Sequence, residues 1–142
     1  MYGNVNSMLC CGFPVLVIDL IFAGGTKLVF RRKRPSHNQQ DMIQLVSVDE
    51  FSFPSGHTTR ATSMALFLAE FFSLSDFMQL LACVWPILIA ASRVMLGRHH
   101  VLDVLCGLSI GAGQYYFAVN YLWLSEETCE RLIRPIQEEL HI

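Results

Sequence analysis

Charged residues are scarce in this chain of 142 residues, where Asp, Glu, Lys and Arg together make up only 15%. The 10 Lys and Arg do not outnumber the 12 Asp and Glu, so the chain lacks the positive excess with which nucleic-acid-binding proteins neutralise phosphates. The five cysteines include no Cys-x-x-Cys pair. We therefore expect no nucleic-acid partner, no disulfide framework and no cysteine-based zinc site.

Apolar residues dominate instead, at 53% of the chain, with a mean hydropathy of +0.42. A membrane-spanning helix needs about 20 largely apolar residues to cross roughly 30 Å of hydrocarbon. Stretches that reach or approach this length lie at about 8–30, 58–74, 77–96 and 101–124. The predicted fold class is all-α, a membrane-embedded bundle of about four transmembrane helices in a single domain, 1–142.

The connecting segments predict how these helices are arranged. Residues 31–57 form a long polar loop, and loops of such length in a compact protein are usually functional. Short turns at 73–76 and at Gly97 then each reverse the direction of the chain for another crossing. Counting the crossings brings the end of the first helix, the start of the second, the end of the third and the start of the fourth to one membrane face. The tail, 125–142, is expected on the opposite face as an amphipathic segment.

Three glycines fall inside the fourth predicted helix, at Gly107, Gly111 and Gly113. Small residues let helix backbones approach closely within a membrane. We expect all three to be close-packing positions.

The predicted meeting point of the helix ends is rich in cations. They come from separate stretches of the chain, namely Lys27 with residues 31–34, Arg93 and Arg98. A juxtamembrane basic cluster alone follows the positive-inside rule, but cations that arrive from separate stretches at one depth also predict an anion site. Phosphate fits such a site because guanidinium groups offer a planar fork of donors to its oxygens.

The sequence Pro54-Ser55-Gly56-His57 stands at the start of the second predicted helix. Unpaired backbone N–H groups and the helix dipole favour an anion there, and Gly56 has no side chain to block a close approach. Ser55 also suits an ordinary N-cap, which is compatible with phosphate contact.

His99 and Asp103 are four residues apart at the start of the fourth predicted helix, so they share one helix face. The carboxylate would accept a proton from one ring nitrogen and leave the other free as a nucleophile. His100 competes for Asp103 on spacing alone, so periodicity does not choose between the two histidines. His57 arrives on another helix, so it can lie across a bound phosphate from His99. One imidazole would then attack phosphorus while the other protonates the leaving oxygen.

Arginines and Lys27 at this face would neutralise phosphoryl charge without a metal. The alternative is a zinc site, whose ligands would be His57, His99, His100 and Asp103. Because the surrounding cations repel a dication, we predict neither a metal nor a cofactor.

Three motifs in this order resemble those of the type 2 phosphatidic acid phosphatase superfamily of lipid phosphatases. The family motifs are K-x6-RP, PSGH and SR-x5-H-x3-D. Every fixed position is matched, by Lys27 with Arg34-Pro35, by Pro54 through His57, and by Ser92-Arg93 with His99 and Asp103.

The resemblance implies a role for each matched residue. His99 would be the nucleophile that forms a phosphohistidine, in preference to His100, with Asp103 as its orienting partner. His57 would be the proton donor to the leaving group. The implied phosphate ligands are Lys27, Arg34, Ser55, Gly56 and Arg93.

The sequence around the motifs is most similar to that of the polyisoprenoid diphosphate phosphatase branch of this family. This implies an integral membrane phosphohydrolase of the endoplasmic reticulum or nuclear envelope, acting on lipid or isoprenoid phosphates such as presqualene or farnesyl diphosphate. The family typically has six membrane helices, and these four correspond to the last four, so we expect the chain to be truncated at its amino terminus.

Two alternatives share the same residues. One is a catalytically inactive membrane scaffold of the same fold, although neither imidazole nor the carboxylate is missing. The other is a vanadate-dependent haloperoxidase, whose anion site resembles that of this family but which the membrane helices argue against.

Overall fold

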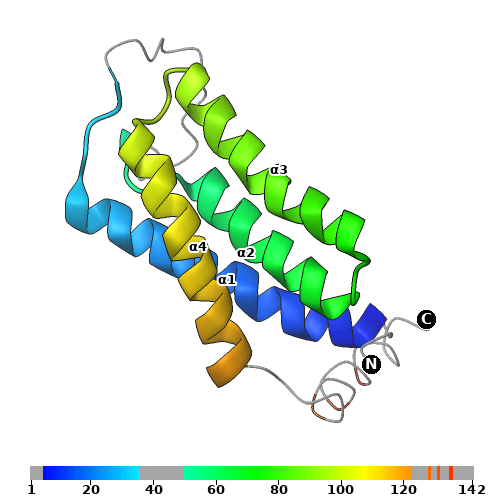
Figure 1. Cartoon of the computed structure of the whole chain (residues 1–142). Helices are drawn as coiled ribbons and strands as arrows, with labels where there is room; N and C mark the ends of the chain where they lie inside the picture. The colour runs from blue at the N-terminus through cyan, green and yellow to red at the C-terminus, as the bar shows by residue number, and fades with distance from the viewer. Residues whose placement is uncertain (1–4, 36–49, 123–127, 129–130, 132–134, 136–142) are drawn as a thin grey trace.

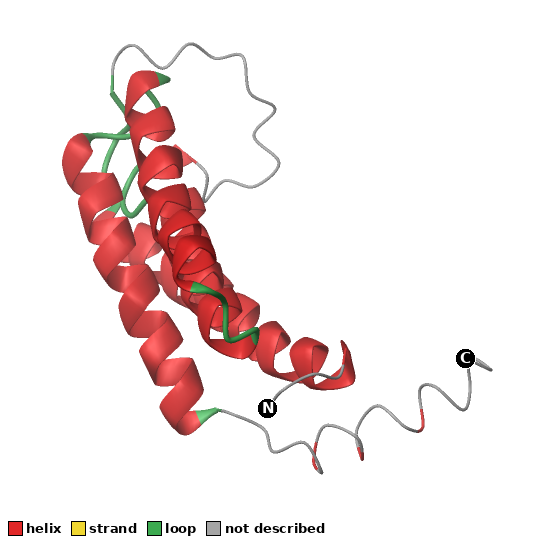
Figure 2. Cartoon of the chain, turned by 45° about the vertical axis from the view of Figure 1, so that its right-hand side comes forward, coloured by secondary structure: helices red, strands yellow, loops and turns green. Residues whose placement is uncertain are grey.

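The computed structural model describes residues 5–35, 50–122, 128, 131 and 135 (Figure 1). Its helices are α1 (Val5–Phe30), α2 (Gly56–Phe71), α3 (Asp76–Met95) and α4 (Val101–Tyr121). Within the described residues there is no strand, and an isolated bridge between Lys33 and Phe51 is the only β-type pairing (Figure 2). The all-α prediction is confirmed, and each predicted helix has its counterpart.

Three of the helices are long and apolar enough to cross a membrane, over Gly12–Phe30, Asp76–Met95 and Val101–Tyr121. The fourth, α2, has only 16 residues. It packs against each of the other three helices. Four buried hydroxyl residues, Thr58, Thr59, Thr62 and Ser63, line α2 and would be costly on a lipid-facing surface. The helix least suited to lipid is therefore the one that the bundle encloses.

The outer surface of the bundle is apolar. On α3, for example, Phe77, Leu80 and Leu88 are each at least 60% exposed. Side chains of this kind are stable in contact with acyl chains rather than with water. The inner cluster lies where α1, α2 and α4 meet and consists of Val15, Ile18, Phe67, Phe71, Tyr115 and Ala118.

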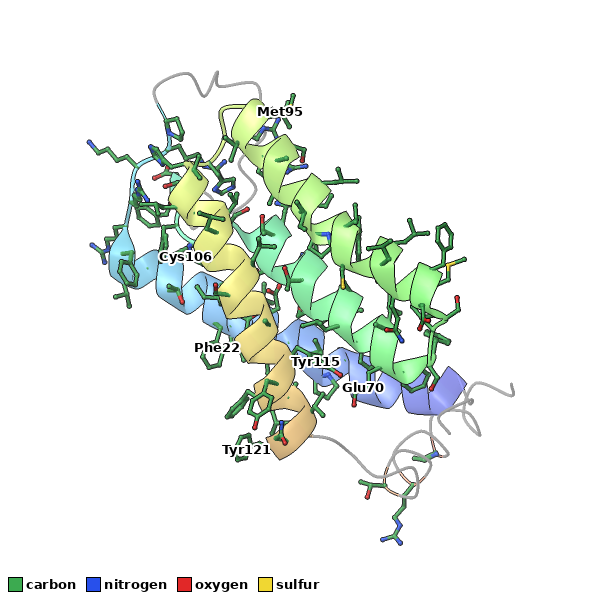
Figure 3. All side chains as sticks on the ribbon, viewed as in Figure 1. Phe22, Glu70, Met95, Cys106, Tyr115 and Tyr121 are labelled. Atoms are coloured by element: carbon green, nitrogen blue, oxygen red, sulfur yellow. The ribbon has the colours of Figure 1, made fainter. Side chains whose placement is uncertain are left out.

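The helix ends gather as the crossing count predicts. Figure 1 shows the end of α1, the start of α2, the end of α3 and the start of α4 at one end of the bundle, at the upper left of the view. Away from that end, the Tyr115 hydroxyl donates to the Glu70 carboxylate and joins α4 to α2 (Figure 3). The predicted amphipathic tail, 125–142, lies almost wholly outside the described residues.

Two glycines bring the backbones of α4 and α2 into contact. A Cβ at Gly111 would lie 2.4 Å from the carbonyl oxygen of Thr59, and one at Gly107 would lie 3.1 Å from Cβ of Thr58. A Cβ at Gly113 would meet nothing within 4 Å. The prediction of close packing holds for Gly107 and Gly111 but is wrong for Gly113, because that position faces away from α2.

Replacing Gly111 with Ala is expected to destabilise the bundle. The added methyl would collide with the Thr59 backbone, which has no rotamer to change, and overpacking of this kind costs about 1–3 kcal/mol. The midpoint of thermal unfolding in detergent should therefore fall. Gly113→Ala is the matched control, since the same methyl enters open space and its midpoint should hold or rise. Equal midpoints for the two variants would contradict this packing.

Candidate active site

The gathered helix ends hold every motif residue within the described part of the chain. Lys27 lies in the last turn of α1 and is buried, and Arg93 lies in the last turn of α3. Gly56 and His57 are the first two residues of α2, directly after Ser55. His99 lies in the turn before α4, and Asp103 lies in the first turn of α4.

The starts of α2 and α4 are bonded directly to each other. The backbone N–H of Ser55 donates to the carbonyl oxygen of Asp103 at 3.1 Å. Ser55 is fully buried, and its hydroxyl oxygen accepts a hydrogen bond from Thr58 Oγ1 at 2.9 Å. Ser55 occupies the N-cap position of α2, but its side chain makes no capping hydrogen bond. The ordinary N-cap interpretation of this hydroxyl is therefore wrong.

Gly56 opens the first turn of α2 to its surroundings. A Cβ built at Gly56 would meet no atom within 4 Å. Because the first-turn N–H groups of a helix lack intrahelical partners, an anion at this position would meet backbone donors without steric obstruction. This geometry fits the predicted oxyanion approach.

The ring of His99 is held by a backbone carbonyl. Nδ1 of His99 lies 2.7 Å from the carbonyl oxygen of Ser52. A carbonyl only accepts, so Nδ1 carries the proton, and Nε2 of the neutral ring keeps its lone pair. His99 is buried, at 5% exposure. This arrangement presents an unprotonated nitrogen as a nucleophile.

Burial lowers the pKa of His99 from 6.5 to about 4. The Ser52 hydrogen bond and the Asp103 charge oppose this shift, while the charges of Arg34 and Lys27 add to it. The ring is therefore neutral near pH 7. The same influences place Arg34 and Lys27 within electrostatic range of His99.

Asp103 does not hydrogen-bond His99. Its Oδ2 lies 4.0 Å from Nδ1 of His99, beyond hydrogen-bond distance. Instead, Oδ2 accepts the backbone N–H of His100 at 2.8 Å and lies 3.1 Å from the Nδ1 of that ring. Oδ1 accepts from Nη1 of Arg32 at 2.8 Å. The predicted direct bond from Asp103 to His99 is thus replaced, because a carboxylate in the first turn caps its own helix.

Sequence reasoning missed two residues of this network, Arg32 and Ser52. The backbone N–H of Ser52 donates to the carbonyl oxygen of Arg32 at 2.8 Å, and its hydroxyl donates to the same oxygen at 3.2 Å. Arg32 reaches Asp103 and Ser52 reaches His99, so the segment after α1, the segment before α2 and the start of α4 are tied together. The basic run 31–34 was the only signal, and it did not distinguish Arg32 from its neighbours.

Arg93 carries an unsatisfied donor. In the part of the chain that the structure describes, its Nε is buried and has no hydrogen-bond partner. A buried N–H group without a partner is costly and calls for an acceptor. A phosphate oxygen would supply one, and the role of Arg93 as a phosphate ligand stays a prediction.

The alternative zinc site is not assembled. Among the described residues, which include all four of its suggested ligands, no three His, Cys, Asp or Glu side chains group closely enough to share a metal ion. His57 is exposed at the start of α2.

Residues 8–127 match the sequence profile of a family described as the PAP2 superfamily. A probable lipid phosphate phosphatase beta of Arabidopsis thaliana is 35% identical over 78% of this chain and 64% of its own length. A lipid A 4'-phosphatase of Porphyromonas gingivalis is 31% identical over 77% of this chain and 48% of its own length.

A decaprenylphosphoryl-5-phosphoribose phosphatase of Mycobacterium tuberculosis is 34% identical over 61% of this chain and 45% of its own length. The chain thus spans between about half and two thirds of the length of these curated relatives. No solved structure matches it. The match extends over most of the chain and includes all three motifs, so the chain belongs to the PAP2 superfamily.

Proposed function

We propose that this chain is an integral membrane phosphohydrolase that removes phosphate from lipid or isoprenoid phosphates and diphosphates, such as presqualene or farnesyl diphosphate, without a metal. The observation that carries the proposal is the neutral, buried ring of His99, whose Nδ1 is anchored on Ser52 and which lies within range of Lys27 and Arg34. The three relatives named above, all of them lipid-related phosphatases, support it. By analogy with the family, its membrane is that of the endoplasmic reticulum or nuclear envelope.

The proposed reaction has two steps. Nε2 of His99 attacks phosphorus, the bond to the leaving oxygen breaks with its electron pair, and His57 gives that oxygen a proton. Water then attacks the phosphohistidine and gives a proton to His57, which releases phosphate and restores His99. Asp103 acts on His99 through its charge and through the start of α4 that it caps.

The phosphate ligands in this proposal come from the end of α1 and the segment after it, from the start of α2 and from the end of α3. Lys27, Arg34 and Arg93 offset the charge on the phosphoryl oxygens, while the Ser55 hydroxyl and the Gly56 backbone supply neutral donors. The site lies at the helix ends, beside an apolar outer surface. A lipid whose tail lies in the bilayer would therefore present its phosphate directly to these groups.

Substituting His99 and His100 one at a time distinguishes the proposed nucleophile from its neighbour at the N-cap of α4. His99→Ala should lower phosphate release from farnesyl diphosphate by roughly 10³-fold or more, because no other nitrogen is placed to attack. His100→Ala should stay within about tenfold of the parent, since His100 takes no part in the proposed reaction and the backbone N–H of residue 100 still donates to the Asp103 carboxylate. Equal rates for His99→Ala and the parent in folded protein would refute the proposal.

The acid side of the pH profile should reflect the lowered pKa of His99. The nucleophile must be neutral, so kcat/KM should not lose activity through His99 protonation until the pH approaches about 4. Histidine ring signals recorded by NMR over the same range, with His99→Gln for assignment, should show this ring titrating well below 6.5. A His99 midpoint at its ordinary value would contradict the buried, Ser52-anchored ring.

Asp103→Asn tests whether the carboxylate acts directly on the nucleophile. Loss of the directly bonded carboxylate in a serine protease triad costs about 10⁴ in kcat. Because Ser52 rather than Asp103 holds the ring here, we expect a smaller loss, on the order of 10- to 100-fold, measured as kcat on farnesyl diphosphate. A loss as large as that of His99→Ala would show that the two groups bond directly during the reaction.

A further inference from the structure

An ion pair lies on the membrane side of this site and takes no part in the reaction described so far. Nε of Arg60 on α2 donates to Oδ2 of Asp19 on α1 at 2.9 Å. Asp19 is fully buried within the apolar span Gly12–Phe30. Ionisable groups at such depth are costly and are more often functional than incidental.

The geometry of this pair suggests a role beyond holding α1 and α2 together, because both side chains keep polar groups without a partner in the described part of the chain. Oδ1 of Asp19 is buried and has no hydrogen-bond partner within the described residues. The side chain of Arg60 remains 53% exposed. Within the described residues, the only hydrogen bond of this side chain is the one from Nε. The carboxylate thus holds one corner of the guanidinium, and the terminal amino groups remain available to a ligand.

Arg60 lies on the same side of α2 as His57. The two residues are three apart and both exposed, whereas Thr58 and Thr59 between them are buried. Residues three apart on a helix share a face, and Arg60 lies about one turn further from the helix start than His57. Arg60 is therefore placed beside the proton donor, in the direction of the lipid tail.

This position matches the second phosphate of a diphosphate. When His99 attacks the terminal phosphorus, the P–O bond to the bridging oxygen breaks, and that oxygen leaves as part of the phosphate that carries the tail. The leaving phosphate must lie between the attacked phosphorus and the tail. For a monophosphate, the leaving group is an alcohol, which has no second phosphate to bind.

We propose that Arg60, held by Asp19, binds the leaving phosphate and makes this site selective for isoprenoid diphosphates over the corresponding monophosphates. The inference rests on the proposed function and adds a specificity-determining residue outside the three motifs. A guanidinium suits the task because it donates to two phosphate oxygens while Nε stays on the carboxylate.

The test compares farnesyl diphosphate with farnesyl monophosphate, which share one tail, on the same preparations of the full chain. Arg60→Gln should lower kcat/KM for the diphosphate by at least about tenfold and change the monophosphate value by no more than about threefold. Arg60→Lys, which keeps the charge, should retain part of the preference. The Arg60→Gln, Asp19→Asn double variant removes both charges and should show the same selective loss without leaving an unpaired buried carboxylate.

An equal loss on both substrates would mean that the pair only holds α1 to α2, and unchanged kinetics would mean that Arg60 does not touch substrate. Either result overturns the inference. If the parent hydrolyses neither substrate, the proposed function fails, and binding of the non-hydrolysable methylene analogue of farnesyl diphosphate decides about Arg60 separately. The parent should bind this analogue at least about tenfold more tightly than Arg60→Gln, and equal affinity would reject the role of Arg60.

Discussion

The backbone contact between α2 and α4 is the constraint on which the site depends. Gly107 and Gly111 let the two helices approach until a methyl group no longer fits between them. At that separation, the Ser55 N–H reaches the Asp103 carbonyl, so the start of α2 is fixed against the start of α4. His57 and His99 reach one end of the bundle because these two starts are joined.

A second constraint closes the site through the segments that flank the polar loop. Ser52 bonds to the backbone of Arg32 and carries the carbonyl that orients His99, while the Arg32 side chain reaches Asp103. α1 ends at Phe30, and the next residue, Arg31, has a φ of 45° in the left-handed region, which changes the direction of the chain there. All three motif regions thus meet in one hydrogen-bonded network, which explains how segments distant in sequence hold a single imidazole.

The sequence was informative where the physics is local. Apolar length predicted the helices, and the crossing count predicted which of their ends meet, because both depend on the thickness of a bilayer. Spacing placed Asp103 on the same helix face as His99 but did not reveal that its carboxylate accepts hydrogen bonds from His100 and Arg32 instead. The choice of donors depends on the conformation of the loop that carries Arg32. The anchoring role of Ser52 is set by loop conformation, which periodicity does not encode. Gly113 was misassigned because a glycine in a membrane helix does not itself indicate which face meets a neighbour.

The burial of His99 places the pKa of its ring well below 7, so the ring can stay neutral during the proposed reaction, which an exposed histidine could not. A phosphate bound among Lys27, Arg34 and Arg93 is an anion, and an anion beside an imidazole favours its protonated form. An exposed ring with an ordinary pKa near 6.5 would be driven towards imidazolium by its own substrate and would lose its nucleophilic lone pair. Burial and the neighbouring cations bring the pKa of His99 to about 4 in the free site. The pKa can therefore increase when phosphate binds, and the ring is still neutral at pH 7. The cations therefore serve twice, since the charges that would hold the phosphate also keep the attacking nitrogen unprotonated.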